Sequence, residues 1–360
     1  MKKFTKFLVI TVPVIILILI VVEIYLRFTV SYIKPVGFTF ELQPDSIYIQ
    51  TPIGKRLRPN TKIITENQFH SNRDILMSIN SLGFRGPEIP LKKADNEYRI
   101  LVIGDSITWQ EDLNDEETWV RLTESYLNQT KSGTLFRVIN AGVGDIGTKE
   151  EIDNLSLTVD QVQPDLVFLQ WYLNDSRPPW GFTQELGYRG FLRRYSVLAD
   201  VIYRQLLLKK WLTETGIIWS GWGSGVDKYN WKTSREDFLK FANYAGHDWG
   251  SAWTDDSWKI IRDEFARLQA LSQKNQFKVI IAAFPVIFQV QADFVEDTPQ
   301  RILAEISKEH QFYYTDLLPY LRIKEKEQNL FFDYAHLNEV GSLFVAEFLT
   351  QYLQNITSQK

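Results

Sequence analysis

Three residues of this sequence have the types and positions of a serine nucleophile and its supporting groups. The first is Ser106, which follows the apolar run Arg99-Ile-Leu-Val-Ile-Gly104 in Gly104-Asp-Ser-Ile-Thr108. A serine on the turn that leaves a buried parallel strand lies at the carboxyl edge of the sheet, where its hydroxyl can face a substrate and its amide an oxyanion. A lone serine at such a turn is more often a helix cap. The nucleophile interpretation therefore requires a base.

His336 is the one histidine of four with a carboxylate three residues before it. That carboxylate, Asp333, lies in Phe332-Asp-Tyr-Ala-His-Leu-Asn338, a short loop before a helix that Asn338 is expected to cap. Such a loop can present both side chains, so that Asp333 holds the imidazole in the tautomer that accepts the serine proton. The alternative is a capping aspartate beside a structural histidine. Because His336 must be neutral to act as a base, activity is expected to fall below pH about 6.5.

Two further segments are expected to reach the same edge. Asn174 ends the run Gln170-Trp-Tyr-Leu-Asn174, and its amide could donate to an oxyanion. The turn Asn140-Ala-Gly-Val-Gly144-Asp-Ile-Gly147 could aim a backbone amide at the same point. It also spells G-x-G-x-x-G, the outline of a dinucleotide site, but the next strand ends in Trp171-Tyr-Leu rather than the acidic residue that such a site needs. Nucleotide binding is therefore disfavoured.

The elements that would position these residues alternate along the chain. Apolar runs suited to buried strands cover 98–104, 135–140, 165–171, 277–284 and 312–315. Helical patterns cover 117–128, 148–159, 257–274, 298–310 and 338–353. This alternation predicts an α/β fold with a parallel sheet covered on both faces, in which ligands bind beyond the carboxyl ends of the strands.

The N-terminus has the pattern of a membrane anchor. Lys2, Lys3 and Lys6 precede an uncharged apolar stretch over 7–22, which becomes long enough to cross a bilayer when extended to about residue 26. No small-residue cleavage site follows it. We therefore expect a cytoplasmic tail over 1–6, a transmembrane helix over 7–27 and an extracytoplasmic remainder, periplasmic or at the cell surface. A proline-punctuated, extended lead-in with short edge strands is expected over 28–97, and the α/β domain over 98–355.

An insertion at about 176–256 breaks the alternation directly after the Asn174 strand. We expect it to form a cap at the active-site edge, lined by tryptophan either as a substrate surface or as a buried core of its own. A helical stretch at 193–212 could lie on a membrane or be an ordinary cap helix with a basic face. Eight of the eleven tryptophans lie in or just beyond the insertion: Trp180, Trp211, Trp219, Trp222, Trp231, Trp249, Trp253 and Trp258.

The composition excludes several classes of function. A net charge of -4 offers no basic excess for nucleic acid. The absence of cysteine excludes disulfides, Cys-zinc sites and iron–sulfur clusters, and a total of four histidines disfavours a His-rich metal site. Nothing in the sequence calls for a cofactor.

These motifs together resemble the SGNH or GDSL-type hydrolases, in a membrane-anchored bacterial form. Gly104-Asp-Ser-Ile-Thr108, the glycine turn, Leu173-Asn-Asp175 and Asp333-x-x-His336 look like the four blocks of that family, in order, and Asn80-Ser-Leu-Gly-Phe-Arg-Gly86 looks like a lead-in of bacterial members. The resemblance implies a flavodoxin-like three-layer fold. It further implies that Ser106 is the nucleophile, His336 the base and Asp333 the carboxylate that orients it. The three oxyanion donors it implies are the Ser106 amide, the Gly144 amide and the Asn174 side chain.

Two positions depart from the family pattern. Tyr172 replaces the glycine of the third block, and glycines at both 142 and 144 leave two registers for the second. Asp105, Tyr172 and Trp180 are candidates to line the substrate. We expect a serine ester hydrolase, an O-acyl (acetyl) esterase on cell-envelope or extracellular carbohydrate. The alternatives are a lipid esterase of the lysophospholipase type, an O-acyltransferase, and a non-catalytic glycan-binding or assembly protein on the same fold.

Overall fold

A five-stranded parallel sheet forms the centre of the protein. The computed structural model describes residues 2–29, 33–36, 39–42, 47–51, 54–68, 70–130, 133–176, 191–215, 229–246 and 248–357. Its strands lie in the order β11-β10-β9-β7-β8, and every neighbouring pair is parallel. The strands are β7 (Glu97–Ile103), β8 (Leu135–Asn140), β9 (Leu166–Tyr172), β10 (Lys278–Phe284) and β11 (Tyr313–Asp316).

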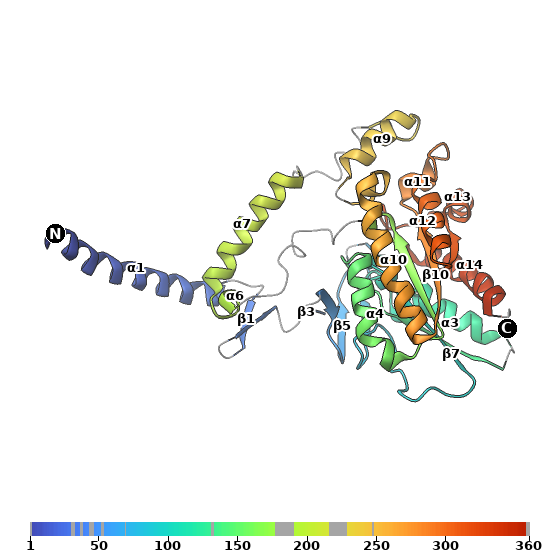
Figure 1. The fold of residues 1–360 in the computed structure, drawn as a ribbon, viewed down its shortest axis with the longest axis horizontal. Helices are drawn as coiled ribbons and strands as arrows, with labels where there is room; N and C mark the ends of the chain where they lie inside the picture. Colours follow the sequence, from blue (N-terminus) through green and yellow to red (C-terminus); the bar gives the residue numbers. More distant parts are fainter. Residues whose placement is uncertain are drawn as a thin grey trace.

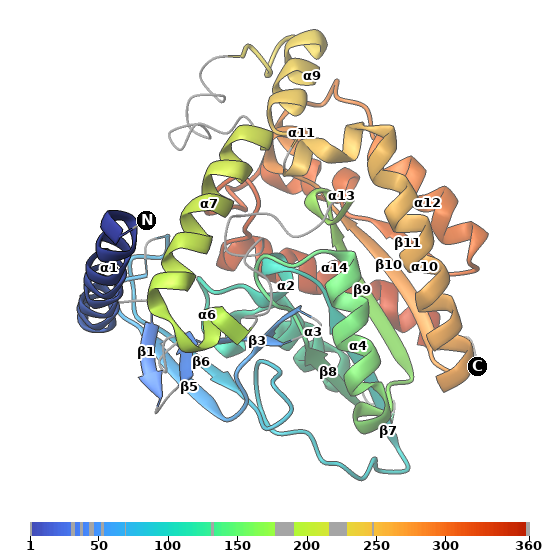
Figure 2. The same ribbon diagram turned by 60° about the vertical axis from the view of Figure 1, so that its left-hand side comes forward.

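Helices cover both faces of this sheet, which confirms the predicted three-layer α/β class (Figures 1 and 2). α3 and α14 pack together on one face, and α4, α10 and α12 lie on the other. Strands buried on both sides need continuous apolar sequence, and every residue of β9 is buried. The covering helices are α3 (Trp119–Gln129), α4 (Thr148–Val162), α10 (Asp255–Asn275), α12 (Thr298–Glu309) and α14 (Glu339–Thr357).

The order of the strands fixes where a ligand site can form. From β7 the chain first adds β8 on one side and then β9 on the other, so the direction of winding reverses between β7 and β9. Helices on opposite faces diverge at such a point and leave a crevice beyond the carboxyl ends of the strands. Ser106 and Asn174 follow these two strands, so both lie at this crevice.

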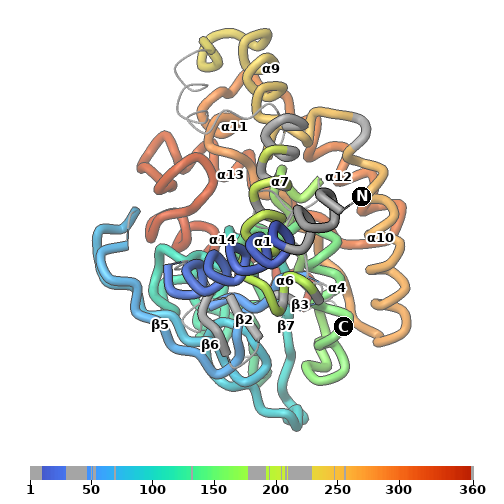
Figure 3. The backbone as a smooth tube through the Cα atoms, turned by 90° about the vertical axis from the view of Figure 1, so that its left-hand side faces the viewer, coloured from blue at the N-terminus to red at the C-terminus, as the bar shows by residue number. Residues whose placement is uncertain are grey.

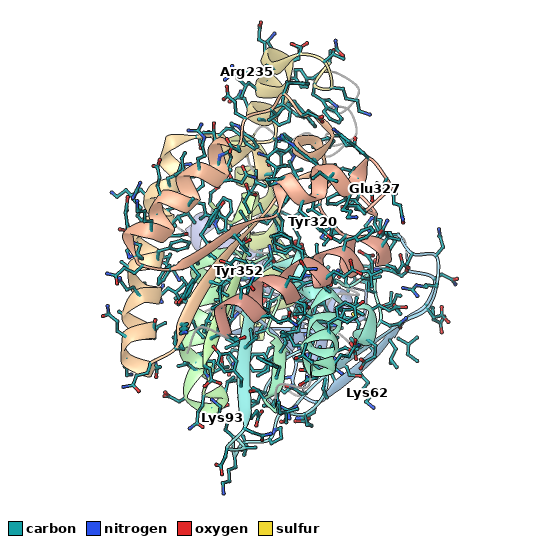
Figure 4. All side chains as sticks on the ribbon, turned by 90° about the vertical axis from the view of Figure 1, so that its right-hand side faces the viewer. Lys62, Lys93, Arg235, Tyr320, Glu327 and Tyr352 are labelled. Atoms are coloured by element: carbon teal, nitrogen blue, oxygen red, sulfur yellow. The ribbon has the colours of Figure 1, made fainter. Side chains whose placement is uncertain are left out.

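Further helices and single turns lie between these elements. The helices among them are α2 (Ser106–Trp109), α6 (Phe191–Tyr195), α7 (Val197–Thr215), α9 (Arg235–Tyr244), α11 (Ile287–Gln291) and α13 (Leu318–Glu325). Three single turns are η1 (Asp115–Glu117), η2 (Leu173–Ser176) and η3 (Trp249–Trp253). Two tyrosines tie α14 in place: Tyr320 of α13 packs on Phe348 at a ring distance of 4.9 Å, and Tyr352 donates to the carbonyl of Tyr314 at 2.8 Å (Figure 4).

The lead-in folds more than the sequence suggested. It forms three antiparallel hairpins, β1 (Ile33–Val36) with β2 (Thr39–Leu42), β3 (Tyr48–Thr51) with β4 (Gly54–Leu57), and β5 (Thr61–Thr65) with β6 (Ile75–Ile79). Alternate residues of β6 are buried, and they pack against the active-site loops. One apolar cluster joins Leu57, Ile75, Met77 and Ile79 of the lead-in to Trp109, Val143 and Ile146 of the domain.

The segment after β6 is built around two polar side chains. Asn80 Oδ1 accepts from the amides of Leu82 and Phe84, both at 3.0 Å, which closes a tight turn. Gly83 and Gly86 have φ of +80° and +107°, a backbone conformation that other residues rarely adopt. The turn aims Arg85 into the domain, where the residue is only 3% exposed.

Arg85 holds the far end of the helix that starts at Ser106. Its guanidinium donates to the carbonyls of Trp109, Gln110 and Leu113 and to Asp115 Oδ1, the last at 2.9 Å. The first two of these acceptors lie at the C-terminal end of α2, where a helix has no partners of its own for its carbonyls. The lead-in thus supplies a structural part of the nucleophile turn.

The N-terminal helix projects away from the α/β domain (Figure 1). Within α1 (Lys2–Thr29), the span Ile10–Thr29 has a mean hydropathy of 2.4 and none of it is buried, so by length and composition it can cross a membrane. Glu23 accepts hydrogen bonds from Ser196 Oγ and from the amides of Val197 and Leu198 at 2.9–3.0 Å. This carboxylate caps α7, which therefore begins beside the C-terminal part of α1 (Figure 3).

The described tryptophans of the insertion mostly belong to a core. Trp231, Trp249 and Trp258 are buried, and Trp253 is partly buried. Trp249 packs against the rings of Phe241 and Phe288 at 5.2 and 5.5 Å. These residues follow the buried-core alternative. Trp180, Trp219 and Trp222 lie outside the described residues, as does the side chain of Trp211.

Replacement of Arg85 tests its structural role. Arg85→Met should lower the free energy of unfolding by about 3–5 kcal/mol, because Asp115 and three carbonyls lose a buried partner. Urea unfolding of the full chain in detergent, followed by tryptophan fluorescence, measures the change. Arg301→Met is the control, since that side chain is exposed and should contribute about 0.5 kcal/mol or less. Equal unfolding midpoints for the two variants would contradict the assignment.

Candidate active site

Ser106, His336 and Asp333 form one continuous hydrogen-bonded chain. Ser106 Oγ lies 2.9 Å from His336 Nε2, and His336 Nδ1 lies 2.8 Å from Asp333 Oδ2. Both distances suit proton transfer from the hydroxyl to an imidazole that a carboxylate orients. The structure therefore brings together the three residues that the sequence selected, across a separation of 230 positions.

The turn after β7 is tightly packed around Gly104. A Cβ on Gly104 would lie 2.4 Å from both Gln170 Oε1 and Thr108 Oγ1, so only glycine fits between the strand and the helix. Asp105 is buried and accepts from the amide of Ile107 at 2.9 Å, as the N-cap of α2. Ser106 is therefore the first helical residue, and its own amide is one of those that a helix leaves without a partner.

The histidine loop is held by its own backbone. The amide of Phe332 donates to the carbonyl of His336 at 2.8 Å, and Asp333 Oδ1 accepts from the amides of Ala335 and His336 at 2.8 and 2.7 Å. Asn338 caps α14, as predicted, by accepting from the amide of Gly341 at 2.9 Å. The two oxygens of Asp333 thus have separate tasks, one in the turn and one on the imidazole.

The electrostatics of the pair make His336 a strong base. Burial alone would lower the pKa of His336, but the hydrogen bond and negative charge of Asp333 raise it to about 9. Burial alone would raise the pKa of Asp333, but the hydrogen bond and charge of His336 and two backbone amides lower it to about 2. Asp333 is therefore ionised throughout the range in which His336 titrates.

Buried carboxyl groups lie behind the site. Asp105, Glu151 and Asp175 are each 1% exposed. Burial raises the pKa of Asp105 to about 6. Burial, and then the neighbouring acids, raise the pKa values of Glu151 and Asp175 well above their usual range. Asp175 Oδ2 accepts from the amide of Tyr172 at 2.7 Å, which shapes the turn that carries Asn174.

The three predicted oxyanion donors sit on the turns that follow β7, β8 and β9. In the glycine turn, the amide of Gly142 donates to Asn140 Oδ1 at 3.0 Å and that of Val143 to the carbonyl of Gly104 at 3.1 Å. For the Gly144 amide, the described part of the chain offers no such acceptor. Asn174 lies in η2 directly after β9 and is partly buried. Their joint action on an oxyanion stays a prediction.

The lead-in also holds the glycine turn. Lys55 Nζ donates to the carbonyl of Gly144 at 2.7 Å, lies 3.3 Å from Asp145 Oδ2 and sits 4.0 Å from the ring centre of Tyr48. A Cβ on Gly144 would lie 2.8 Å from Tyr48 Oη, so a larger residue here would have to displace the Tyr48 side chain. No sequence motif marks Lys55, because its partner lies 89 positions away.

The residues proposed to line the substrate have different outcomes. Asp105 and Tyr172 are both 1% exposed, so in this structure their contacts are internal. Trp180 lies outside the described residues. Substrate contact by these three stays a prediction. Among the described residues, no three His, Asp or Glu side chains converge as metal ligands.

Solved structures with a similar fold include several esterases. An acetyl xylan esterase is 18% identical, over 71% of this chain and 98% of its own, with a TM-score of 0.37. A two-domain esterase active on acetylated mannans is 13% identical, over 73% and 50%, with a TM-score of 0.41. A member of the lipolytic G-D-S-L family from Veillonella parvula is 14% identical, over 71% and 97%, with a TM-score of 0.35.

The similar structures thus include esterases and a G-D-S-L member, the group that the sequence motifs resemble. No protein-family model matches this sequence, and no curated protein matches it. At these identities and TM-scores, the substrate of the present chain does not follow from its neighbours.

The pKa of His336 predicts how Ser106 reacts as pH changes. Below a pKa of about 9 the imidazole is increasingly protonated and cannot accept the serine proton. Labelling of Ser106 by a fluorophosphonate should therefore rise by about tenfold per pH unit between pH 6 and 8 and level off near pH 9. The sequence-based expectation that activity falls below pH about 6.5 assumes the pKa of an ordinary histidine. It does not include the effect of the Asp333 charge on His336.

Asp333→Asn is the matched variant for this experiment. It should move the inflection towards pH 6.5 and slow labelling by about 10⁴-fold, because the imidazole loses its orienting charge. Labelling quenched at a series of times and followed by intact-protein mass spectrometry gives the rates of the wild type and of the variant. A wild-type rate that is flat between pH 7 and 9 would contradict the raised pKa of His336, since a base with an ordinary histidine pKa is already neutral in that range.

Proposed function

We propose that this protein is a serine ester hydrolase that works through an acyl-serine intermediate. The observation that carries the proposal is the unbroken chain from Ser106 through His336 to Asp333, with contacts of 2.9 and 2.8 Å. It lies at the carboxyl ends of the strands, where the winding of the sheet reverses. A non-catalytic binding protein would have no need of an orienting carboxylate, a basic imidazole and a hydroxyl in register.

The first half of the reaction forms the acyl-enzyme. His336 Nε2 takes the proton of Ser106 Oγ as the oxygen attacks the ester carbonyl carbon. Negative charge then develops on the former carbonyl oxygen, where the amides of Ser106 and Gly144 and the side chain of Asn174 are proposed to donate. The tetrahedral intermediate collapses by breaking the bond to the alcohol oxygen, which receives the proton from His336.

The second half releases the acid. Water enters in place of the alcohol and loses a proton to His336 as its oxygen attacks the acyl carbon. The intermediate expels Ser106 Oγ, which recovers its proton from the imidazolium. Throughout the cycle Asp333 stays ionised and holds Nδ1–H, so that the imidazole can move a proton without turning.

We further propose that the ester is an acyl, in particular acetyl, group on carbohydrate of the cell envelope or outside the cell. An anchor over Ile10–Thr29 preceded by Lys2, Lys3 and Lys6 supports an extracytoplasmic domain held close to the envelope. Acetylated xylan and mannan, the polymers named for two similar structures, are suitable test substrates. Transfer of the acyl group to a sugar hydroxyl instead of water is the same chemistry with a different acceptor.

One observation favours a lipid ester as the alternative substrate. α7 begins at Glu23 of the membrane helix, and Leu192, Ile202 and Leu206 in or just before it are 50–72% exposed. An apolar surface beside the anchor could meet acyl chains at the membrane interface. Hydrolysis of lysophospholipid would then exceed hydrolysis of acetylated polymer.

Two substitutions test the proposed chemistry. Ser106→Ala should reduce hydrolysis of p-nitrophenyl acetate by about 10⁴-fold or more, because the nucleophile is lost. Asn174→Ala should slow turnover by about 10²–10³-fold with Ser106 still present, because one oxyanion donor is removed. Purified full-length protein in detergent is assayed by initial rates. Wild-type turnover in Ser106→Ala would refute the acyl-serine route.

A substrate series separates the two classes of ester. We expect kcat/KM for acetyl esters to exceed that for palmitoyl esters by about tenfold or more, and acetate to be released from acetylated xylan or mannan. Ser106→Ala is the blank for each substrate. The opposite order, with lysophospholipid cleaved and no acetate released, would assign the enzyme to lipids.

A further inference from the structure

A second histidine lies directly against the catalytic chain. His70 comes from the turn between β5 and β6, and its Nε2 lies 3.9 Å from Asp333 Oδ2. Its ring stacks on those of His336 and Phe332, with centre distances of 6.4 and 6.2 Å and interplanar angles of 28° and 14°. None of the steps above uses this residue.

A buried carboxylate fixes the place of His70. Asp112 is 3% exposed, and its Oδ1 lies 3.1 Å from His70 Nδ1 and accepts from Gln68 Nε2 at 2.8 Å. A buried carboxylate needs such donors, because an unpaired charge in the interior is costly. Asp112 follows the nucleophile helix by three residues, so it belongs to the same rigid turn as Ser106.

The turn that carries His70 is itself tied to the domain. Arg73 makes a two-fold contact with Glu117, with both distances at 2.7 Å, and a further contact with Glu339 at 3.0 Å. The amide of Asn72 donates to the carbonyl of Gln68 at 2.8 Å. His70 therefore stands on a fixed support between the nucleophile turn and the histidine loop.

We propose that His70 is a positioning residue of the active site, held by Asp112 and holding the Asp333 carboxylate against His336. The proposal rests on the esterase function above. Its reason is geometric: Asp333 Oδ1 is engaged by two amides and Oδ2 by His336, and His70 Nε2 lies 3.9 Å from the same Oδ2 while its ring stacks on that of His336. A displaced carboxylate would turn the imidazole away from Ser106.

Charge gives the arrangement a second readout. The negative charge of Asp112 helps to raise the pKa of His336, after Asp333 and Asp105. The other charged groups that act on His336 are Glu111 and Asp248, while His70 stacks beside it. Asp112→Asn removes the negative charge and keeps an amide oxygen that can accept from His70 Nδ1, so the inflection of the pH profile should move to lower pH.

The experiment compares variants of His70 with a matched control. His70→Ala should lower kcat for p-nitrophenyl acetate by about tenfold or more and leave KM within about twofold, because orientation and not binding is lost. His70→Gln, whose amide reaches about as far as Nε2, should recover most of that loss. His310→Ala is the control, since His310 is partly buried and stacked on Phe312 at the opposite edge of the sheet, and it should keep the wild-type kcat.

The outcomes separate this proposal from the proposed function. An absence of fluorophosphonate labelling at Ser106 in the wild type would refute the esterase itself. With the wild type labelled, a wild-type kcat in His70→Ala would overturn the role of His70. Three other outcomes would also overturn it. They are an equal loss of kcat in His310→Ala, a change in KM as large as the change in kcat, and a kcat in His70→Gln as low as that in His70→Ala.

Discussion

The hydrogen bonds of one buried guanidinium, that of Arg85, fix how the lead-in packs against the α/β domain. Arg85 cannot be left in the interior without acceptors, and it finds them at the end of the helix that begins with Ser106. The cost of burying this charge therefore becomes a constraint on geometry. The segment before the sheet and the turn after its first strand must take up their positions together.

The same logic recurs at two further contacts beside the active site. Lys55 is buried against the carbonyl of Gly144, and the ring of His70 is held by the buried Asp112. In each case a polar group from the lead-in satisfies a partner in a loop at the carboxyl edge. The sheet sets the positions of the loops to within a turn, and these contacts select one conformation for each. The active site is thus a joint product of the α/β domain and the chain before it.

Sequence was a good guide wherever structure followed from local pattern. The central strands β9 and β10 are mostly apolar because both of their faces are buried, whereas the edge strand β11 is only partly buried. The observed bounds of all five strands differ from the predicted ones by a residue or so. Ser106 can be predicted because it follows directly on an apolar strand, and Asp333 and His336 can be predicted because they lie three residues apart in one loop. Glycines at 142 and 144 allow two registers in sequence, and which amide would serve an oxyanion stays a prediction; in three dimensions the Gly142 amide donates to Asn140 Oδ1.

The lead-in was the weakest part of the prediction, for a physical reason. Its prolines and polar residues are typical of exposed chain, and two of its hairpins, β3–β4 and β5–β6, are stabilised by packing on apolar residues of the domain. His70 has no local signal in the sequence, because Asn67 and not a carboxylate stands three residues before it, and its carboxylate partner lies 42 positions later. Contacts of this kind depend on tertiary packing and leave no local pattern.

The position of the lead-in bears on what proteolysis between the predicted anchor and the sheet would do. A cut before β3 would leave Lys55, His70 and Arg85 on the same chain as the triad, and with them the supports of the nucleophile and glycine turns. A cut between Arg85 and β7 would break the chain between the parallel sheet and those supports. With the proposed anchor and function, the first cut would convert a tethered enzyme into a diffusible one, while the second would leave the triad without a covalent link to its supports. Two cuts about forty residues apart would therefore have different consequences.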